Sequence, residues 1–201
     1  MWQGCQNDNI PIDTSDVYRM TMSEIILSRT LQLRPLTPAD HPVLQALMQR
    51  IYPPAYAHLW PDGGTWYLRR QYGRANYLSE LAEPNAIYHF VFYYEKPTGI
   101  VRLVKGTSLV DQPTVRACKL HRIYLDQAIH GQGIGKQIIQ WTIDTCRQQG
   151  FDLLWLEAMD TAPAALAFYE RMGFTRSGAF RLDMPLMYPS LRGMYRLALP
   201  L

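Results

Sequence analysis

The sequence predicts a mixed α/β fold in which most strands are antiparallel and one pair is parallel. Aromatic and β-branched runs in residues 86–104 predict an antiparallel hairpin. A strand, a glycine-rich turn and an amphipathic helix follow over residues 115–150, and a further strand, helix and strand occupy residues 153–182. A helix that connects two strands of one sheet brings the chain back to its starting end. We therefore expect the strands on either side of the glycine turn and its helix to be parallel.

The composition is that of an ordinary globular protein. The 201 residues are 48% apolar and 12% aromatic, which is enough to bury the core of one domain and too much for a disordered chain. No apolar run is long enough to span a membrane and the first residues lack the pattern of a secretory signal, so we expect a cytoplasmic protein. Cys5, Cys118 and Cys146 are far apart, which favours free thiols over a disulfide or a zinc pair.

The formal net charge of +3 is unevenly distributed along the chain. Residues 1–27 hold four acids and one arginine, so the remainder carries +6, and 16 of the 20 basic residues are arginine (20 minus 4 lysines). Arginine makes forked contacts with phosphate and carboxylate groups, which favours an anionic ligand, although a solvated mixed surface would give the same count. Since the arginines are scattered rather than clustered, we expect no nucleic-acid partner.

The chain divides into a leader and one domain. Residues 1–27 are polar and aperiodic except near Ile25, and we interpret them as a poorly ordered leader, or as residues upstream of a later start at Met20 or Met22. Residues 28–201 are expected to form a single domain.

Local patterns predict the elements of this domain in order. Residues 30–34 alternate like a strand, and Thr37-Pro38 opens a helix that Pro53-Pro54 is expected to end. The later elements are a helix at 64–82, hairpin strands at 86–94 and 100–104 with a turn at 95–99, a strand at 115–125, a helix from the glycine loop to Gly150, a strand at 153–158, a helix at 162–172, and strands at 174–182 and near 192–199. The last strand is expected to be a free edge that could pair with a second copy, so both a monomer and a homodimer are open.

The glycine loop Gly131-Gln132-Gly133-Ile134-Gly135 predicts an anion site. Glycines at alternate positions let the backbone turn sharply, and the free N–H groups at the start of the following helix suit a pyrophosphate. The spacing excludes a Walker A loop, which needs four residues before Gly-Lys, and it differs from the G-x-G-x-x-G dinucleotide fingerprint. A tight strand-to-helix turn without a ligand is the alternative.

Two stretches, LHRIYLDQAIHGQGIGKQII and LWLEAMDTAPAALAFYERMGF, resemble the signature regions of the GNAT superfamily of acyl-CoA-dependent N-acetyltransferases. The first signature, R/Q-x-x-G-x-G/A, is met by Gly133 and Gly135, with His130 in the Arg/Gln place. The second, A-x-x-F/L-Y-x-x-x-G-F, is met without a gap by Ala165, Phe168, Tyr169, Gly173 and Phe174. The resemblance covers about residues 29–199.

The resemblance implies a fold and a co-substrate. The fold is a mixed, mostly antiparallel sheet whose central parallel pair is splayed, flanked by about four helices. Acetyl-CoA would be the co-substrate, with no metal, and its pantetheine arm would lie against backbone groups of Ile123, Tyr124 and Leu125. The residues that the resemblance assigns to the phosphates are His130, Gly131, Gln132, Gly133, Ile134, Gly135 and Lys136. His130 replaces the usual bracing Arg or Gln, and Ala162 stands where an Asn usually contacts the pantetheine.

The resemblance also implies direct attack by a neutral amine, which requires an acid and a base. Tyr169 matches the acid that protonates the departing thiolate; a core tyrosine is the alternative. Lys119 occupies the position that often carries a glutamate base, and lysine cannot accept a proton. His121, two residues further along the strand, is our candidate base, with a structural histidine as the alternative and Glu157 in reserve.

The expected acceptor is a primary amine of a small molecule. Seven aromatic residues within 52–77 could hold a cation or could pack against the sheet. The tail FYERMGFTRSGAF resembles the bacterial spermidine/spermine-type acetyltransferases. However, Arg50, Arg69, Arg70 and Arg74 outnumber the nearby acids, which favours an acceptor with an anionic group over a polyamine. The alternatives are a CoA-binding sensor without turnover, and acetylation of protein N-termini or lysines.

Overall fold

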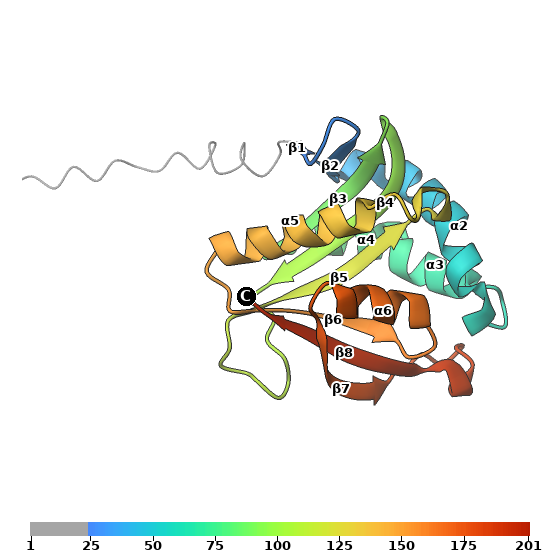
Figure 1. Cartoon of the computed structure of the whole chain (residues 1–201). Helices are drawn as coiled ribbons and strands as arrows, with labels where there is room; N and C mark the ends of the chain where they lie inside the picture. Colours follow the sequence, from blue (N-terminus) through green and yellow to red (C-terminus); the bar gives the residue numbers. More distant parts are fainter. Residues whose placement is uncertain (1–23) are drawn as a thin grey trace, which may run out of the picture.

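The computed structural model describes residues 24–201, which form an eight-stranded sheet in the order β1-β2-β3-β4-β5-β6-β8-β7 (Figure 1). Only β5 and β6 are parallel; every other neighbouring pair is antiparallel. The strands are β1 (Ile25–Ile26), β2 (Leu31–Pro35), β3 (Ala86–Tyr93), β4 (Lys96–Lys105), β5 (Ala117–Leu125), β6 (Leu153–Met159), β7 (Thr175–Arg181) and β8 (Gly193–Pro200). The predicted mixed fold, mostly antiparallel with one parallel pair, is confirmed.

Helices cover both faces of the sheet. The α-helices are α2 (His41–Tyr56), α3 (Thr65–Tyr72), α4 (Arg74–Leu81), α5 (Ile134–Gln148) and α6 (Pro163–Arg171). Figure 1 shows α5 and α6 on one face and α2 to α4 on the other. Ile138 and Ile139 of α5 lie in one core, whereas Leu44 and Met48 of α2 pack with Phe90 in another. The amphipathic pattern of each helix therefore matches the face that it buries.

The prediction that Pro53-Pro54 ends the first helix is wrong. Both prolines lie inside α2, which continues to Tyr56, and the N–H of Ala57 still donates to the carbonyl of Pro53. Proline removes two N–H donors from this turn. The side chains of Ile51 and Tyr52 just before it are buried against the sheet, and this packing holds the turn in helical form.

The single helix predicted over 64–82 is two helices separated at Gly73. The backbone of Gly73 is extended (φ −65°, ψ 150°), and a Cβ atom there would lie 2.4 Å from the carbonyl oxygen of Arg69. Only a residue without a side chain allows the chain to turn this closely, so glycine breaks the helix.

The hairpin turn also differs from the prediction. The turn is Tyr94-Glu95, both with positive φ (45° and 60°), and β4 begins at Lys96 instead of Ile100. Positive φ at both central residues is the backbone of the tight two-residue turn that matches the twist of paired strands. A register shift at Val91/Phe92 lies opposite Pro97, where an interrupted ladder tolerates a residue without an N–H.

The last strand is not a free edge. β8 lies between β6 and β7, so the described edges of the sheet are β1 and β7. The order of the elements in the sequence did not reveal that β7 takes the edge position and that β8 then returns between β6 and β7. The expectation of a poorly ordered leader falls largely on residues 1–23, which lie outside the described residues, while Ile25 and Ile26 pair with β2.

Three further observations concern residues 24–201. No helix in that range is both long and apolar enough to cross a lipid bilayer. No group of three or more His, Cys, Asp or Glu side chains there is arranged to hold a metal ion. Cys118 and Cys146 are buried and carry free thiols, while Cys5 lies outside the described residues.

Candidate active site

The parallel strands β5 and β6 separate at their carboxyl ends. Their pairing runs from Ala117/Leu153 only to Leu120/Leu156. Beyond that point β5 stays paired with β4 as far as Leu125, and β6 stays paired with β8 as far as Met159. Each strand therefore continues with its outer neighbour while the space between the two opens, as expected for a splayed central pair.

A cavity of about 310 Å³ lies at this opening. Its lining includes Tyr169 of α6, His121 of β5 and Glu157 of β6, the three side chains predicted to carry the chemistry. Ile123 and Tyr124 of β5 also line it. The fold thus brings His121 and Tyr169 to one cavity, although they lie almost 50 positions apart in the sequence.

A β-bulge at His121 begins where the strands part. Leu120 is opposite Leu103 of β4 and Arg122 is opposite Arg102, so His121 is an extra residue in the ladder. Cys118 and Leu120 pack into the core under α5, as regular alternation requires. After the bulge the alternation is reset, because Arg122 contacts Glu80 of α4 and Tyr124 contacts Tyr52 of α2.

The bulge leaves backbone groups of β5 directed into the opening. The N–H of Asp126 donates to the carbonyl of Thr98 at the end of β4 (2.8 Å). Because successive N–H groups in a strand point to opposite sides, those of Leu125 and Ile123 point away from β4, toward the separated β6. Of the three residues predicted to contact the pantetheine, Ile123 and Leu125 therefore direct their N–H groups into the opening, whereas Tyr124 directs its N–H toward β4.

The glycine loop follows directly and leads into α5. Gly131 and Gly133 have φ of 77° and 75°, and a Cβ at either position would meet open space. These glycines are required by the left-handed backbone rather than by crowding. Gly133 is the N-cap of α5, and no side chain caps its N–H groups. The first turn, which includes Ile134, Gly135 and Lys136, therefore offers free N–H donors at the positive end of a helix dipole.

The loop also packs against the opposite side of the opening. A Cβ on Gly135 would lie 3.4 Å from the ring of Phe168 in α6 and 3.8 Å from the Leu125 side chain. The small residue thus lets the start of α5 approach the turn that carries Tyr169. The Nε2 atom of His130 lies 3.3 Å from the carbonyl oxygen of Leu125, and the Gln132 amide donates to the carbonyl of Ala128.

Tyr169 lies at the boundary of core and cavity. Its ring contacts those of Phe168 and Phe174 at centroid distances of 5.3 and 5.8 Å. Burial, and to a smaller extent the neighbouring Tyr56, raises the pKa of the Tyr169 phenol. The hydroxyl is therefore protonated at neutral pH and can act as a proton donor.

The environment of His121 disfavours the role of base that we expected for it. Burial, together with the positive charges of Arg122, Arg102 and Lys119, lowers the pKa of His121 to about 2. Its Nδ1 atom is the hydrogen-bond partner of the Arg102 guanidinium. Since arginine is only a donor, Nδ1 is the unprotonated acceptor of a neutral ring. A group whose conjugate acid is this strong takes a proton from an amine poorly.

Glu157 lies in a different electrostatic setting on the same side of the sheet. Its Oε2 atom accepts from the Lys119 ammonium at 2.8 Å, and Oε1 lies 3.7 Å from Nε of Arg196. The Lys119 ammonium also lies 4.5 Å from the centroid of the Trp155 ring. Lys119 therefore orients the carboxylate at the cavity wall, although it cannot serve as a base itself.

Sequence reasoning missed a buried ionic network beneath the cavity. Arg122 donates to both carboxylate oxygens of Glu80 at 2.6 and 2.7 Å, with only 4% and 9% of the two side chains exposed. Arg102 donates to Glu83 at 2.5 Å. The available signal was an arginine within each of two apolar strand runs, IVRLV and HRIYL, since a buried guanidinium requires a partner.

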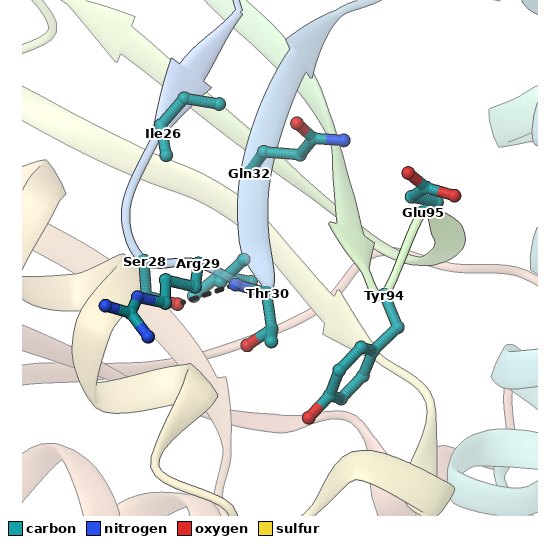
Figure 2. Close-up of a pocket in the computed structure, with 8 residues that line it drawn as sticks. Ile26, Ser28, Arg29, Thr30, Gln32, Tyr94 and Glu95 are labelled. Atoms are coloured by element: carbon teal, nitrogen blue, oxygen red, sulfur yellow. Dashed lines mark hydrogen bonds between the residues drawn. The ribbon is translucent and has the colours of Figure 1, made fainter.

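A second hollow lies at the β1 edge of the sheet and holds none of the predicted site residues. Figure 2 shows it between the β1–β2 hairpin, with Ser28 and Thr30, and the β3–β4 turn, with Tyr94 and Glu95. The Thr30 N–H donates to the Ser28 hydroxyl there at 3.4 Å. This hollow lacks the glycine loop and the candidate catalytic side chains, so the opening between β5 and β6 is the candidate active site.

Comparison with known proteins identifies the family. The model of the acetyltransferase (GNAT) family matches residues 45–174, which include both strands of the opening, the glycine loop and Tyr169. The chain belongs to the GNAT acetyltransferase family. The resemblance inferred from the two sequence signatures is thereby confirmed at the level of the family.

Curated GNAT relatives match parts of the chain. N-acetyltransferase 8 of Homo sapiens is 29% identical over 102 residues, which is 50% of this chain and 43% of that protein. The [ribosomal protein bS18]-alanine N-acetyltransferase of Escherichia coli (strain K12) is 31% identical over 68 residues, 34% of this chain and 46% of that protein. The matched segments span less than half of each relative.

Solved GNAT structures match nearly the whole chain. RimL, a ribosomal L7/L12 alpha-N-protein acetyltransferase in complex with coenzyme A, has a TM-score of 0.69 at 17% identity and covers 89% of this chain and 98% of its own. The PaiA N-acetyltransferase of Thermoplasma acidophilum, also with coenzyme A, has a TM-score of 0.66 at 15% identity, with 86% and 99% covered. These matches show that the GNAT fold is shared.

The buried pair Glu80–Arg122 leads to a stability prediction. Glu80→Ala removes the only carboxylate that contacts Arg122 in the described residues, and should lower the free energy of unfolding by about 3–5 kcal/mol because a buried charge loses its partner. Glu170→Ala is the control. It breaks a half-exposed pair with Arg176 at 3.8 Å and should cost less than about 1 kcal/mol. Urea unfolding measures both, and equal losses would contradict the prediction.

Two histidines with a lowered pKa, His89 and His121, predict acid sensitivity. Burial lowers the pKa of His89 to about 4, and that of His121 is about 2, both from 6.5. Below pH 6.5 the unfolded chain takes up protons that the folded protein does not bind. Stability is therefore greatest above this pH and should fall on acidification by up to about 1.4 kcal/mol per pH unit for each histidine.

Urea titrations at about pH 7, 6 and 5 test this loss, and His89→Asn should reduce its slope. The same slope in the variant and the unaltered protein would contradict the assignment to His89.

Proposed function

We propose that this protein transfers the acetyl group of acetyl-CoA to a primary amine by direct attack within a ternary complex. The observation that carries the proposal is the opening between β5 and β6, which joins free backbone N–H groups, an uncapped helix N-terminus and Tyr169 in one region. RimL and PaiA, which share the fold, were both solved with coenzyme A. Acetyl-CoA would supply the activated acyl group as a thioester.

Backbone groups of the chain would bind and polarise this co-substrate. The N–H groups of Ile123 and Leu125, directed into the opening, are suited to contact the pantetheine arm and to stabilise negative charge on the thioester oxygen. The residues proposed for the pyrophosphate are His130, Gly131, Gln132, Gly133, Ile134, Gly135 and Lys136. Most of these contacts use main-chain N–H groups, so His130 in place of Arg or Gln leaves the essential donors intact.

Two side chains would handle the protons. The amine nitrogen forms a bond to the acetyl carbon and the carbon–sulfur bond breaks. The Tyr169 hydroxyl gives its proton to the departing CoA thiolate, and the base removes one proton from the attacking nitrogen. Between the two candidates, the neutral and weakly basic His121 is disfavoured, and the carboxylate of Glu157 at the cavity wall is the better base, directly or through water.

For the acceptor we propose a small-molecule primary amine. A second candidate, the N-terminus of a protein, is favoured by the names of relatives and fold neighbours that modify ribosomal proteins. A polyamine gains no support, because Glu157, the carboxylate among the described lining residues, is already paired with Lys119. The non-enzymatic alternative is a sensor that binds CoA without turnover. It is motivated by Lys119, His130 and Ala162.

Tyr169→Phe tests the proposed acid. The variant keeps the ring packing but loses the proton donor, so kcat should fall by roughly 100-fold while the affinity for acetyl-CoA is unchanged. Thiol release with an amine library measures turnover, and calorimetry measures binding. Tyr94→Phe, at an exposed residue of the β3–β4 turn that does not line the cavity, is the matched control and should have no effect. If the protein binds acetyl-CoA but releases no CoA thiol in the presence of any amine, the sensor is favoured instead.

Glu157→Gln tests the proposed base. Its amide keeps the size of the side chain but cannot accept the amine proton, so kcat/KM for the amine should fall by roughly 10- to 1,000-fold at neutral pH and recover partly as the pH approaches the pKa of the amine. His121→Asn should have the smaller effect on this pH profile. A larger loss of pH dependence in His121→Asn would return the role to the histidine.

A further inference from the structure

One wall of the cavity is built from interlocking aromatic rings. Tyr52 stacks on Tyr56 and Tyr67 at centroid distances of 5.0 and 4.7 Å, and Trp60 lies 5.3 Å from Tyr67. Tyr124 of β5 meets Tyr56 edge-on at 5.6 Å. The polar atoms of this wall are partly satisfied within it, because the Trp60 indole N–H donates to the Tyr52 hydroxyl at 2.8 Å. What the wall offers to a ligand is mainly ring surface.

A second wall of the cavity is built from thioether and aliphatic side chains. Met159 comes from the end of β6, Met194 from the start of β8, and Leu182, Met184 and Met187 from the segment that joins β7 to β8. The Tyr188 N–H that follows this segment donates to the carbonyl of Leu59, next to Trp60, at 3.0 Å. The two walls are thus linked at one end. Methionine side chains adapt to irregular apolar ligands and contact aromatic rings favourably.

Between these walls the described lining offers little charge for a ligand. The charged lining residues are Arg122, which is bound to Glu80 by two hydrogen bonds, and Glu157, which is bound to Lys119. His121 is a neutral ring engaged by Arg102.

The arginines that suggested an acceptor with an anionic group do not line the described part of the cavity. Arg50 binds Asp126 and the carbonyl of Pro97, and Arg70 lies over the Trp66 ring. The basis for expecting an anionic acceptor is therefore removed.

We propose that the acceptor is a primary amine whose carbon carries an uncharged apolar group, either an aromatic ring or a branched aliphatic or thioether chain. The apolar group would enter between the aromatic and methionine walls and leave the nitrogen at the opening beside Tyr169. This inference rests on the proposed acetyl transfer. It names the chemistry that the acceptor must present, whether on a small molecule or on the first residue of a peptide.

The same lining would assist the amine to react. Apolar surroundings disfavour an ammonium ion, so an amine held there by its apolar group loses its proton more readily than in water. The faces of Tyr56 and Tyr124 can accommodate the ammonium form on entry. Binding energy from a part of the acceptor that does not react would thus be used to create the neutral nucleophile.

A matched panel of amino acid amides tests the proposal with the full-length protein and acetyl-CoA. Phenylalaninamide, leucinamide and methioninamide should exceed glycinamide in kcat/KM by roughly 10- to 100-fold, because burial of the side group favours the bound state. Glutamic acid amide and spermidine should be slower than the apolar amides. Equal or faster turnover of glycinamide, the acidic amide or spermidine would overturn the proposal.

Two further arms distinguish the source of the amine. One compares 2-phenylethylamine with ethylamine, and the other compares tripeptides that begin with Phe or Met with those that begin with Ser or Ala. A preference confined to the first arm indicates a small molecule, and one confined to the second indicates a peptide N-terminus. Either result supports the proposal that the acceptor carries an apolar group. If neither arm shows a preference for the apolar amine, the proposal is overturned.

Variants of the methionine wall tie the preference to this cavity. Met184→Gln should lower kcat/KM for the apolar amides by roughly 10-fold and leave the KM for acetyl-CoA unchanged. Met184→Leu should keep kcat/KM for the apolar amides near that of the unaltered protein. Leu186→Gln, at an exposed leucine two residues away, is the matched control and should change nothing. Unchanged selectivity in Met184→Gln would overturn the assignment.

Failure of the proposed function has a separate signature. If acetyl-CoA binds but no amine in the panel releases thiol, the transfer reaction itself is wrong. Calorimetry of phenylalaninamide and glycinamide with the CoA-loaded protein still tests the pocket in that case, since the apolar amide should bind at least about 10-fold more tightly. Equal affinities would overturn the apolar preference independently of catalysis.

Discussion

The separation of β5 from β6 is the constraint on which the rest of the site depends. Two parallel strands normally satisfy one another's backbone along their whole length, yet here the pairing ends at Leu120/Leu156. The outer ladders with β4 and β8 continue and hold the two strands apart. The glycine loop and α5 follow the end of β5, and α6 follows the end of β6. The glycine loop, the unpaired backbone of β5 and Tyr169 are therefore brought to one opening by the connections of the sheet.

The ionic network under the opening determines which charges a ligand meets. Arg122 and Arg102 come from strands, while Glu80 and Glu83 lie in and just beyond α4. These contacts fasten α4 and the residue Glu83 just beyond it to the sheet at the bulge. They also neutralise most of the buried charge within the protein itself. The rest of the described lining consists mainly of aromatic, methionine and aliphatic side chains, which is the observation behind the proposed apolar acceptor.

Sequence patterns predicted the mixed sheet, the glycine loop and the helix of Tyr169 because each depends on local periodicity or on residues close in the chain. The divided helix at Gly73 and the continuation of α2 through Pro53 depend on contacts with other elements, and local rules misjudged both. The position of β8 between β6 and β7 is a matter of long-range pairing. His121 was chosen for its ordinary pKa, which burial and three surrounding cations have removed.

The bulge at His121 shows how one surplus residue can define a site. In a regular ladder the presence of His121 would turn Arg122 and Tyr124 toward α5, and it would bring Ile123 and Leu125 to the face covered by α2 to α4. The bulge absorbs the surplus, so a chain that lacked His121 would keep every later side chain on its present face. Its hydrophobic pattern would look unchanged, while the bend at the point where the strands part would be gone. One surplus residue therefore sets the bend of the strand where the opening begins, without changing which later side chains lie on each face of the sheet.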